Sequence, residues 1–129
     1  MLREWDENRE VDWHLAEHPD HAPFLDFITQ LNRLYCQSPA LWALDHSYEG
    51  FKWVEHLSPN PCVFGYTRTG GGSRIVALFN FSDVDAPVTV DWHGQLLLRT
   101  DRDTWDAQTE QDIPHQLPPY CGMLFQMKD

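Results

Sequence analysis

The chain has 129 residues, which is enough for one ordinary domain with its own hydrophobic core. Its formal net charge is -11, from 9 basic and 20 acidic residues. This acidity argues against nucleic acid and against anionic membranes as partners, because both are bound through clustered Lys and Arg. Aromatic residues make up 13% of the chain and include six Trp, a composition compatible with carbohydrate binding, although most such rings belong to a core.

The sequence also predicts the compartment. No apolar run reaches the roughly 20 residues needed to cross a bilayer, and the first ten residues lack the apolar stretch of a signal peptide. We therefore expect a cytoplasmic protein. The cysteines Cys36, Cys62 and Cys121 are odd in number and far apart, which favours reduced and mostly buried thiols over disulfides.

Residues 1–22 combine acids, aromatic rings and histidines without helical or strand periodicity, which predicts a loop. Trp5, Trp13 and His14 are the candidate sugar-contacting residues, because an exposed indole can stack on the C–H face of a sugar ring. The alternative is that these rings attach the loop to a partner domain.

The same loop contains a histidine pattern that resembles a metal site. His14, His18 and His21 have the spacing of ligands on one helix face. Pro19 interrupts such a helix, and no cysteine or fourth ligand lies nearby. We therefore expect exposed loop histidines and no metal site.

Residues 23–37 are predicted to form one amphipathic helix. Pro23 suits a first helical turn, and Ser38 ends the helix because the residue before a proline avoids the α region. A helix this short is marginal by itself, so its apolar stripe must pack on something. The stripe consists of Phe24, Phe27, Ile28, Leu31, Leu34 and Tyr35.

After Pro39 the hydrophobic period becomes strand-like, with turn-forming residues between the apolar runs. The fold class is therefore mainly β, an antiparallel β-sandwich preceded by one helix and an N-terminal loop. The loop from Thr69 to Ser73 is a hairpin candidate. Residues 102–114 are polar and predict a long loop. The candidate strands are Phe51 to His56, Val63 to Thr69, Arg74 to Phe81, Val88 to Trp92, Leu96 to Thr100 and Met123 to Met127.

The residues do not form a recognisable catalytic set. Asp83 with Asp85, and Asp101 with Asp103, are carboxylate pairs of the kind found in glycosidases, but they occupy turns between strands, where Asp is favoured for local reasons. The three glycines from Gly70 lack the Lys and Ser or Thr of a phosphate-binding loop. We expect no catalytic residue and no cofactor.

Several sequence blocks follow one another in the order and at the spacing of one known family. The chain from Arg3 to about Phe125 resembles the C-terminal part of bacterial glycogen (1,4-α-glucan) branching enzyme, of the α-amylase-like glycoside hydrolase superfamily. The match is strongest up to Trp53 and poor over residues 92–116. The blocks are Arg3-Glu4-Trp5, Val11-Asp12-Trp13-His14-Leu15, Leu31-Asn32-Arg33-Leu34-Tyr35, Ala40-Leu41-Trp42-Ala43-Leu44-Asp45, Gly50-Phe51-Lys52-Trp53-Val54, Val63 to Arg68, Ile75 to Ser82 and Leu117-Pro118-Pro119.

This resemblance implies a division at residue 38. Residues 1–38 correspond to the end of the catalytic barrel, its last loop and last helix, and residues 39–129 to the complete C-terminal all-β domain. Such enzymes transfer α-1,4-glucan chains to form α-1,6 branches in glycogen. The family's catalytic carboxylates precede this part, so the chain alone is expected to be inactive. The loop after the last barrel strand lies on the catalytic face, which implicates Trp5, Trp13 and His14 in contact with α-glucan.

Two other functions remain open from the sequence. A free-standing carbohydrate-binding module would carry coplanar aromatic rings on one sheet face, for example Trp53, Tyr66 and Trp92. A structural interaction protein would instead dock, or self-associate, through the apolar stripe of the helix at residues 23–37.

Overall fold

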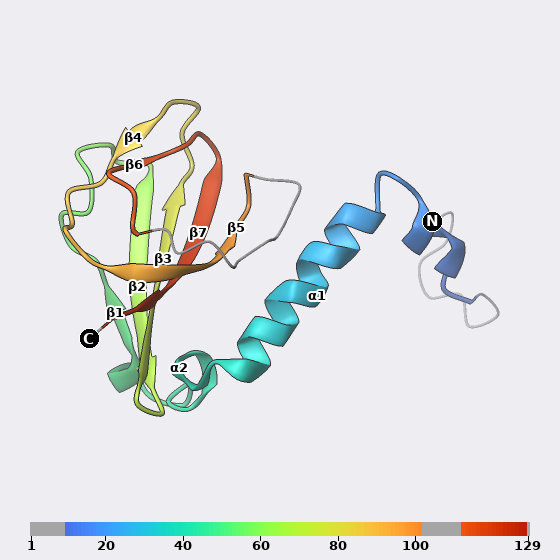
Figure 1. Ribbon diagram of the computed structural model, residues 1–129, viewed down its shortest axis with the longest axis horizontal. Coiled ribbons are helices and arrows are strands. Elements are labelled where there is room, and N and C mark those ends of the chain that lie inside the picture. The colour runs from blue at the N-terminus through green and yellow to red at the C-terminus, as the bar shows by residue number, and fades with distance from the viewer. Residues whose placement is uncertain (1–9, 102–111, 129) are drawn as a thin grey trace.

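The computed structural model describes residues 10–101 and 112–128 and consists mainly of one antiparallel sheet (Figure 1). Its spatial order is β1-β2-β3-β7-β5, and the short strands β4 and β6 pair as a second sheet. The bounds are β1 (Phe51–Trp53), β2 (Val63–Gly70), β3 (Ser73–Asn80), β4 (Ala86–Pro87), β5 (Gly94–Arg99), β6 (Gln116–Leu117) and β7 (Cys121–Met127).

The core lies between the two sheets. Val76 and Leu78 of β3 and Phe125 of β7 project from the inner face of the large sheet, and Ala86 and Leu117 oppose them from the small one. All five are at most 1% exposed. This two-layer arrangement confirms the predicted mainly-β, antiparallel sandwich, in which irregular segments complete the smaller layer.

The helices precede the sheet. Helix α1 (Ala22–Gln37) confirms the predicted helix, with Pro23 in its first turn, and it extends away from the sheet in Figure 1. The 3-10 turn η1 (Trp13–Glu17) lies at its far end, and the short helix α2 (Pro39–Trp42) and the turn η2 (Tyr48–Gly50) lie near the sheet. In the described part of the chain, no helix combines the length and apolarity that a bilayer crossing requires.

Two predicted strands differ from the structure. Residues 88–92 form no strand, although their side chains alternate between buried and exposed as predicted. The backbone there follows the edge of the core: the amide of Val88 donates to His115 O and that of Thr89 to Leu57 O, so no ladder forms. Strand β1 ends at Trp53 instead of continuing to residue 56, where His56 adopts a positive φ of 54°.

The expectation of mostly buried thiols is wrong for two cysteines. All three are free, but only Cys121 is buried. Cys36 lies on α1 and Cys62 in the turn before β2, and both are exposed. Burial raises the pKa of the Cys121 thiol to about 11.

Candidate functional site

The N-terminal segment places two of the three predicted sugar-contacting residues together. Trp13 and His14 are consecutive at the start of η1, where the amide of Trp13 donates to Val11 O at 2.8 Å. Both side chains are exposed, and 74% of Trp13 is accessible. Trp5 lies outside the described residues. Contact of these residues with glucan stays a prediction.

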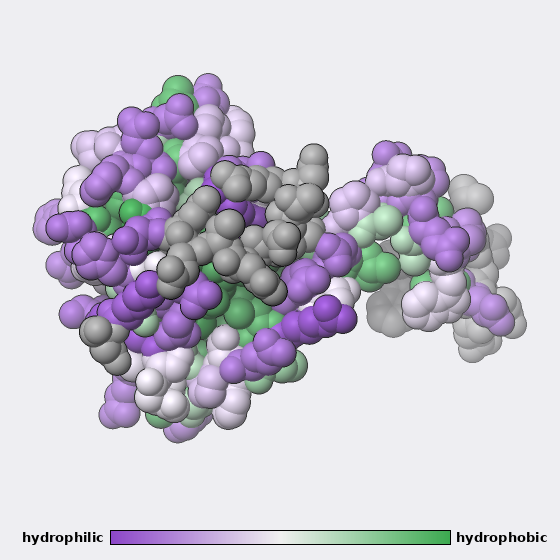
Figure 2. Space-filling view, in the orientation of Figure 1, coloured by the Kyte–Doolittle hydropathy of each residue, from purple (hydrophilic) through white to green (hydrophobic). Residues whose placement is uncertain are grey.

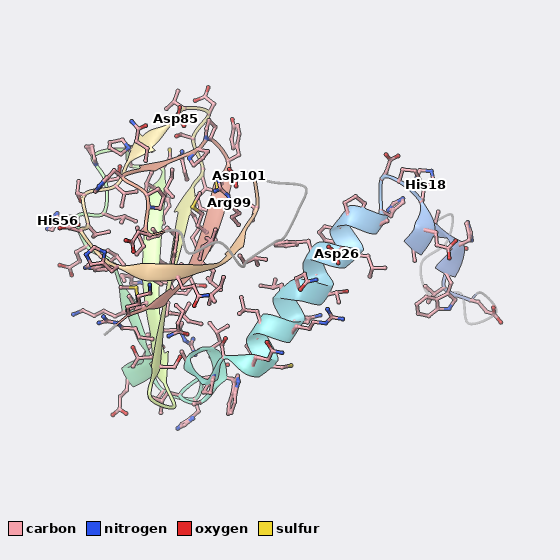
Figure 3. All side chains as sticks on the ribbon, viewed as in Figure 1. His18, Asp26, His56, Asp85, Arg99 and Asp101 are labelled. Carbon is pink, nitrogen blue, oxygen red and sulfur yellow. The ribbon has the colours of Figure 1, made fainter. Side chains whose placement is uncertain are left out.

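The histidines of this segment stay near the surface. His18 lies between η1 and α1, with its Nδ1 atom 3.7 Å from an oxygen of Asp20 (Figure 3). Its ring centroid is 5.5 Å from that of His21 in an edge-on arrangement. Among residues 10–101 and 112–128, no three His, Cys, Asp or Glu side chains gather as metal ligands would.

The outer face of the large sheet, opposite the core, carries six aromatic rings that we call the outer aromatic cluster. Neighbouring rings lie 5.1 to 6.1 Å apart. The cross-strand register explains the contacts, because Trp53 is opposite Tyr66 and Phe64 is opposite Phe79. Large parts of Trp53, Phe64 and Phe81 are exposed. The cluster consists of Phe51, Trp53, Phe64, Tyr66, Phe79 and Phe81.

The helices cover only part of this outer face. Helix α2 packs over the end of β2 and β3, where Ile75 is fully buried. Beside it, an open groove of about 570 Å³ separates α1 from the sheet, with Leu31 and Tyr35 on the helix side and Tyr66 and Leu124 on the sheet side. Figure 2 shows apolar residues gathered between the β domain and α1.

Helix α1 leaves its apolar stripe open. None of its residues is buried, and Phe24 and Tyr35 of the stripe are 67% and 46% exposed. Its stripe and the outer aromatic cluster therefore form two uncovered apolar surfaces linked by the groove. Exposed apolar areas of this kind mark sites of association.

The aromatic row expected of a carbohydrate-binding module is not present. The rings of Trp53 and Tyr66 are nearly perpendicular, at 88°, because the strand register brings them together edge to face. Trp92 packs against the core, on the other side of the sheet from these two rings. The three residues proposed for a coplanar row therefore neither share a face nor form a flat platform.

Of the carboxylates considered as catalytic pairs, the described Asp101 has a local partner. Asp101 forms an ion pair with Arg99, whose hydrogen bond and positive charge lower the pKa of this carboxyl (Figure 3). Asp85 is exposed in the turn before β4 (Figure 3). Asp103 lies outside the described residues. The ion pair keeps Asp101 charged, which favours a structural role for it.

Comparison with known proteins relates this chain to one group of enzymes. None of the protein-family models matches it. It is 44% identical over 77 residues to the 1,4-alpha-glucan branching enzyme GlgB of Cupriavidus necator, a match that covers 59% of this chain and 10% of that enzyme. It is 35% identical over 79 residues to GlgB of Protochlamydia amoebophila, covering 61% and 11%. The chain resembles the C-terminal part of glycogen branching enzymes.

A third relative, the branching enzyme of Nitratidesulfovibrio vulgaris strain Hildenborough, is 38% identical over 82 residues, with 63% of this chain and 13% of the enzyme covered. The chain thus spans between 10% and 13% of the length of these three branching enzymes.

Solved structures agree on the fold. Trehalulose synthase MutB of Pseudomonas mesoacidophila MX-45 gives a TM-score of 0.59 at 17% identity and covers 80% of this chain and 17% of its own.

The similarity to MutB supports the fold alone: an all-β C-terminal domain of the kind found in α-amylase-family enzymes. Sequence reasoning missed four members of the outer aromatic cluster, namely Phe51, Phe64, Phe79 and Phe81. The signal was present, because Ile75 to Phe79 form a continuous apolar run. Such a run is typical of a strand covered on both faces.

Proposed function

We propose that this chain is the C-terminal part of a 1,4-α-glucan branching enzyme and that it braces the catalytic barrel without taking part in the chemistry. The observation that carries the proposal is the pair of uncovered apolar surfaces in a chain similar to GlgB enzymes. A barrel packed on α1 and on the outer aromatic cluster would cover both.

The length of the relatives supports the barrel as the partner that covers these two apolar surfaces. Most of each branching enzyme lies outside the segment that this chain matches. In this proposal residues 1–38 belong to the end of the barrel and residues 39–129 are the all-β domain. The full-length enzyme transfers α-1,4-glucan chains to create α-1,6 branches. No residue of this chain matches the family's catalytic carboxylates, so the chain alone does not branch amylose.

Contact with glucan forms a separate part of the proposal. Trp13 is exposed at the far end of α1, and Trp5 and His14 neighbour it in the sequence. In the full-length enzyme these residues line the glucan path beside the catalytic site, where an indole stacks on a sugar ring.

A chimera tests the bracing role. The matching C-terminal segment of the C. necator branching enzyme is replaced by this chain, and the product is compared with the enzyme that simply lacks the segment. We expect the chimera to be monomeric and to branch amylose in an iodine-staining assay, and the shortened enzyme to aggregate. A shortened enzyme that is as stable and active as the chimera would refute the proposal.

Single substitutions identify the contact surface in the same chimera. Phe81→Ser changes an exposed ring of the cluster, whereas Val84→Ser changes an apolar residue of similar exposure in the neighbouring turn. We expect Phe81→Ser to lower the melting temperature and Val84→Ser to leave it unchanged. The rival hypothesis, self-association through α1, predicts that the isolated chain sediments as a dimer and that Phe24→Glu makes it monomeric.

A further inference from the structure

A second pocket, which we call the rim pocket, opens on the inner side of β1. It has a volume of about 390 Å³. Its lining includes Lys52 and Thr67, which are opposite each other in the β1–β2 register. Because side chains alternate along a strand, Lys52 projects from the face opposite Phe51 and Trp53. The rim pocket therefore opens at the edge strand β1, and Trp53 of the outer aromatic cluster also lines it.

The wall of the rim pocket is apolar. Val54, Val90 and Trp92 line it, and the same three residues pack, partly buried, against the hydrophobic core. The pocket is therefore the place where the core opens to solvent, and two indoles, those of Trp53 and Trp92, are among its lining residues. An aromatic wall of this type suits the C–H face of a sugar ring.

The edge of the rim pocket is charged. Lys52, Glu55 and Arg74 line it and are exposed. Their side chains form no ion pair with any other residue that the structure describes. The pocket therefore presents one carboxylate and two cationic groups that are available to a ligand.

The backbone holds the rim pocket in shape. The segment from Val88 to His93 is tied at both ends: the amide of Val88 donates to His115 O at 2.8 Å, and Lys128 N donates to His93 O at 3.2 Å. Between them, Thr89 N donates to Leu57 O at 2.9 Å. A ligand would meet a formed pocket and would not have to order this segment first.

We propose that the rim pocket binds a glucosyl unit of an α-glucan chain, as a binding site distinct from the N-terminal candidates. A sugar hydroxyl both donates and accepts, so it can satisfy Glu55 and Arg74 at once. A simple cation would be repelled by Lys52 and Arg74. The volume falls within the range of about 300–1,000 Å³ that is typical of small-ligand sites.

The choice of α-glucan as the sugar rests on the proposed function. The position of the pocket fits a polymer, since β1 and η1 lie at opposite ends of the molecule in Figure 1. One glucan chain held at the rim pocket would be anchored away from Trp13. The site would then tether the polymer and leave the chemistry to the barrel.

The test is a titration of the 129-residue chain with maltoheptaose, in which ¹H–¹⁵N NMR spectra are recorded at each step. We expect the indole signal of Trp92 and the amides of Glu55 and Arg74 to shift, also in a Trp13→Ala background. Unchanged signals at the rim pocket at saturating maltoheptaose would overturn the proposal.

Matched variants test whether Glu55 and Arg74 contribute to binding. Glu55→Gln and Arg74→Gln each weaken binding about tenfold, the effect of losing a charged hydrogen bond. Glu49→Gln and Arg33→Gln, at other exposed positions, are the controls and leave binding unchanged. Equal affinity in all four variants would refute the site. These four side chains are exposed, so the variants retain the fold.

The chimera separates this inference from the proposed function. Glu55→Gln in the chimera should leave branching of short amylose unchanged and weaken retention on immobilised glycogen. An active chimera without rim-pocket shifts would overturn the binding site alone. Rim-pocket shifts with an inactive chimera would overturn the proposed function alone.

Discussion

The guanidinium of Arg68 joins the sheet to the segment after α2, with its Nη2 atom 2.7 Å from Oδ1 of Asp45. The same nitrogen donates to the backbone carbonyl of Leu41 at 3.1 Å. Arg68 lies on the outer face of β2, and its side chain is only 17% exposed. The contact therefore fixes α2 on the sheet, and with it the base of α1.

The two partners of Arg68 should contribute unequally to stability. Asp45→Asn keeps the carbonyl bond and removes a mostly exposed ion pair, so we expect a loss of less than about 1 kcal/mol. Arg68→Met also leaves the Leu41 carbonyl without its donor, which costs about 1–3 kcal/mol. Urea unfolding measures both. Equal losses for the two variants would show that the carbonyl contact is unimportant.

The β2–β3 hairpin permits a comparison of two adjacent glycines. Gly71 and Gly72 form its two-residue turn, with φ values of 59° and 75°. A Cβ atom on Gly72 meets nothing within 4 Å, whereas one on Gly71 would lie 2.5 Å from the Cβ of Pro39. We expect Gly72→Ala to cost about 1–2 kcal/mol from backbone strain alone.

Gly71→Ala carries the same strain and also displaces α2, so its cost should exceed that of Gly72→Ala by at least about 1 kcal/mol. Thermal unfolding of the two variants provides the comparison. If the two melting temperatures agree, α2 is not held against this hairpin in solution.

Asn80 is a buried polar side chain at the end of β3, only 1% exposed. Its Oδ1 atom accepts from the amide and the hydroxyl of Ser82, at 2.9 and 2.6 Å. Its Nδ2 atom donates to three backbone carbonyls, those of Val84, Leu117 and Pro118. It thereby joins the turn after β3 to the turn before β7.

Replacing this amide with a carboxyl of the same shape should be severe. Asn80→Asp directs an oxygen at three carbonyls, so we expect a loss of at least about 3 kcal/mol at neutral pH. The control Asn32→Asp lies at an exposed position on α1 and should change stability by less than about 0.5 kcal/mol. A native-like melting temperature for Asn80→Asp would contradict the hydrogen-bond arrangement.

The three thiols should differ in reactivity. Cys36 and Cys62 are exposed and should react with a thiol reagent in the native protein, while Cys121 should react only after denaturation. The pKa of the Cys121 thiol is raised to about 11 by burial, with the nearby Asp101 carboxylate as the next cause. Labelling of all three cysteines at equal rates would rule out this buried position.

The raised pKa of the Cys121 thiol also makes the stability of the folded chain depend on pH. Between pH about 8.5, where an unfolded cysteine ionises, and about 11, the folded chain retains a proton that the unfolded chain has lost. Stability should therefore fall as pH rises through this window. In Cys121→Ala this decline in stability should be smaller. Chemical denaturation of both proteins at pH 7.5 and at pH 10 measures the difference.

Local patterns sufficed for the elements that depend on nearby residues. The stripe from Phe24 to Tyr35 and the Ser38-Pro39 stop predicted α1, and the glycines after Gly70 predicted the hairpin. The pattern over residues 88–92 predicted a strand because its side chains do alternate. Alternation reports which side chains are buried, but it does not report whether the backbone finds a partner strand, which tertiary structure decides.

The candidate sites depend on contacts between distant residues, so less of them could be predicted. The alternative of a carbohydrate-binding module required Trp53, Tyr66 and Trp92 to be coplanar, but the strand register places the first two edge to face, and Trp92 packs against the core. The rim pocket joins Lys52, Arg74 and Trp92 from three separate segments, and no local spacing brings them together.

The position of β7 has a consequence for synthesis of the protein. Strand β7 (Cys121–Met127) lies between β3 and β5, so β5 (Gly94–Arg99) emerges from the ribosome well before its neighbour in the sheet. At about 5–20 residues per second, β5 waits one second or more with unpaired backbone groups. The hairpin of β2 and β3 can form at once, whereas closure of the sheet must follow translation of β7.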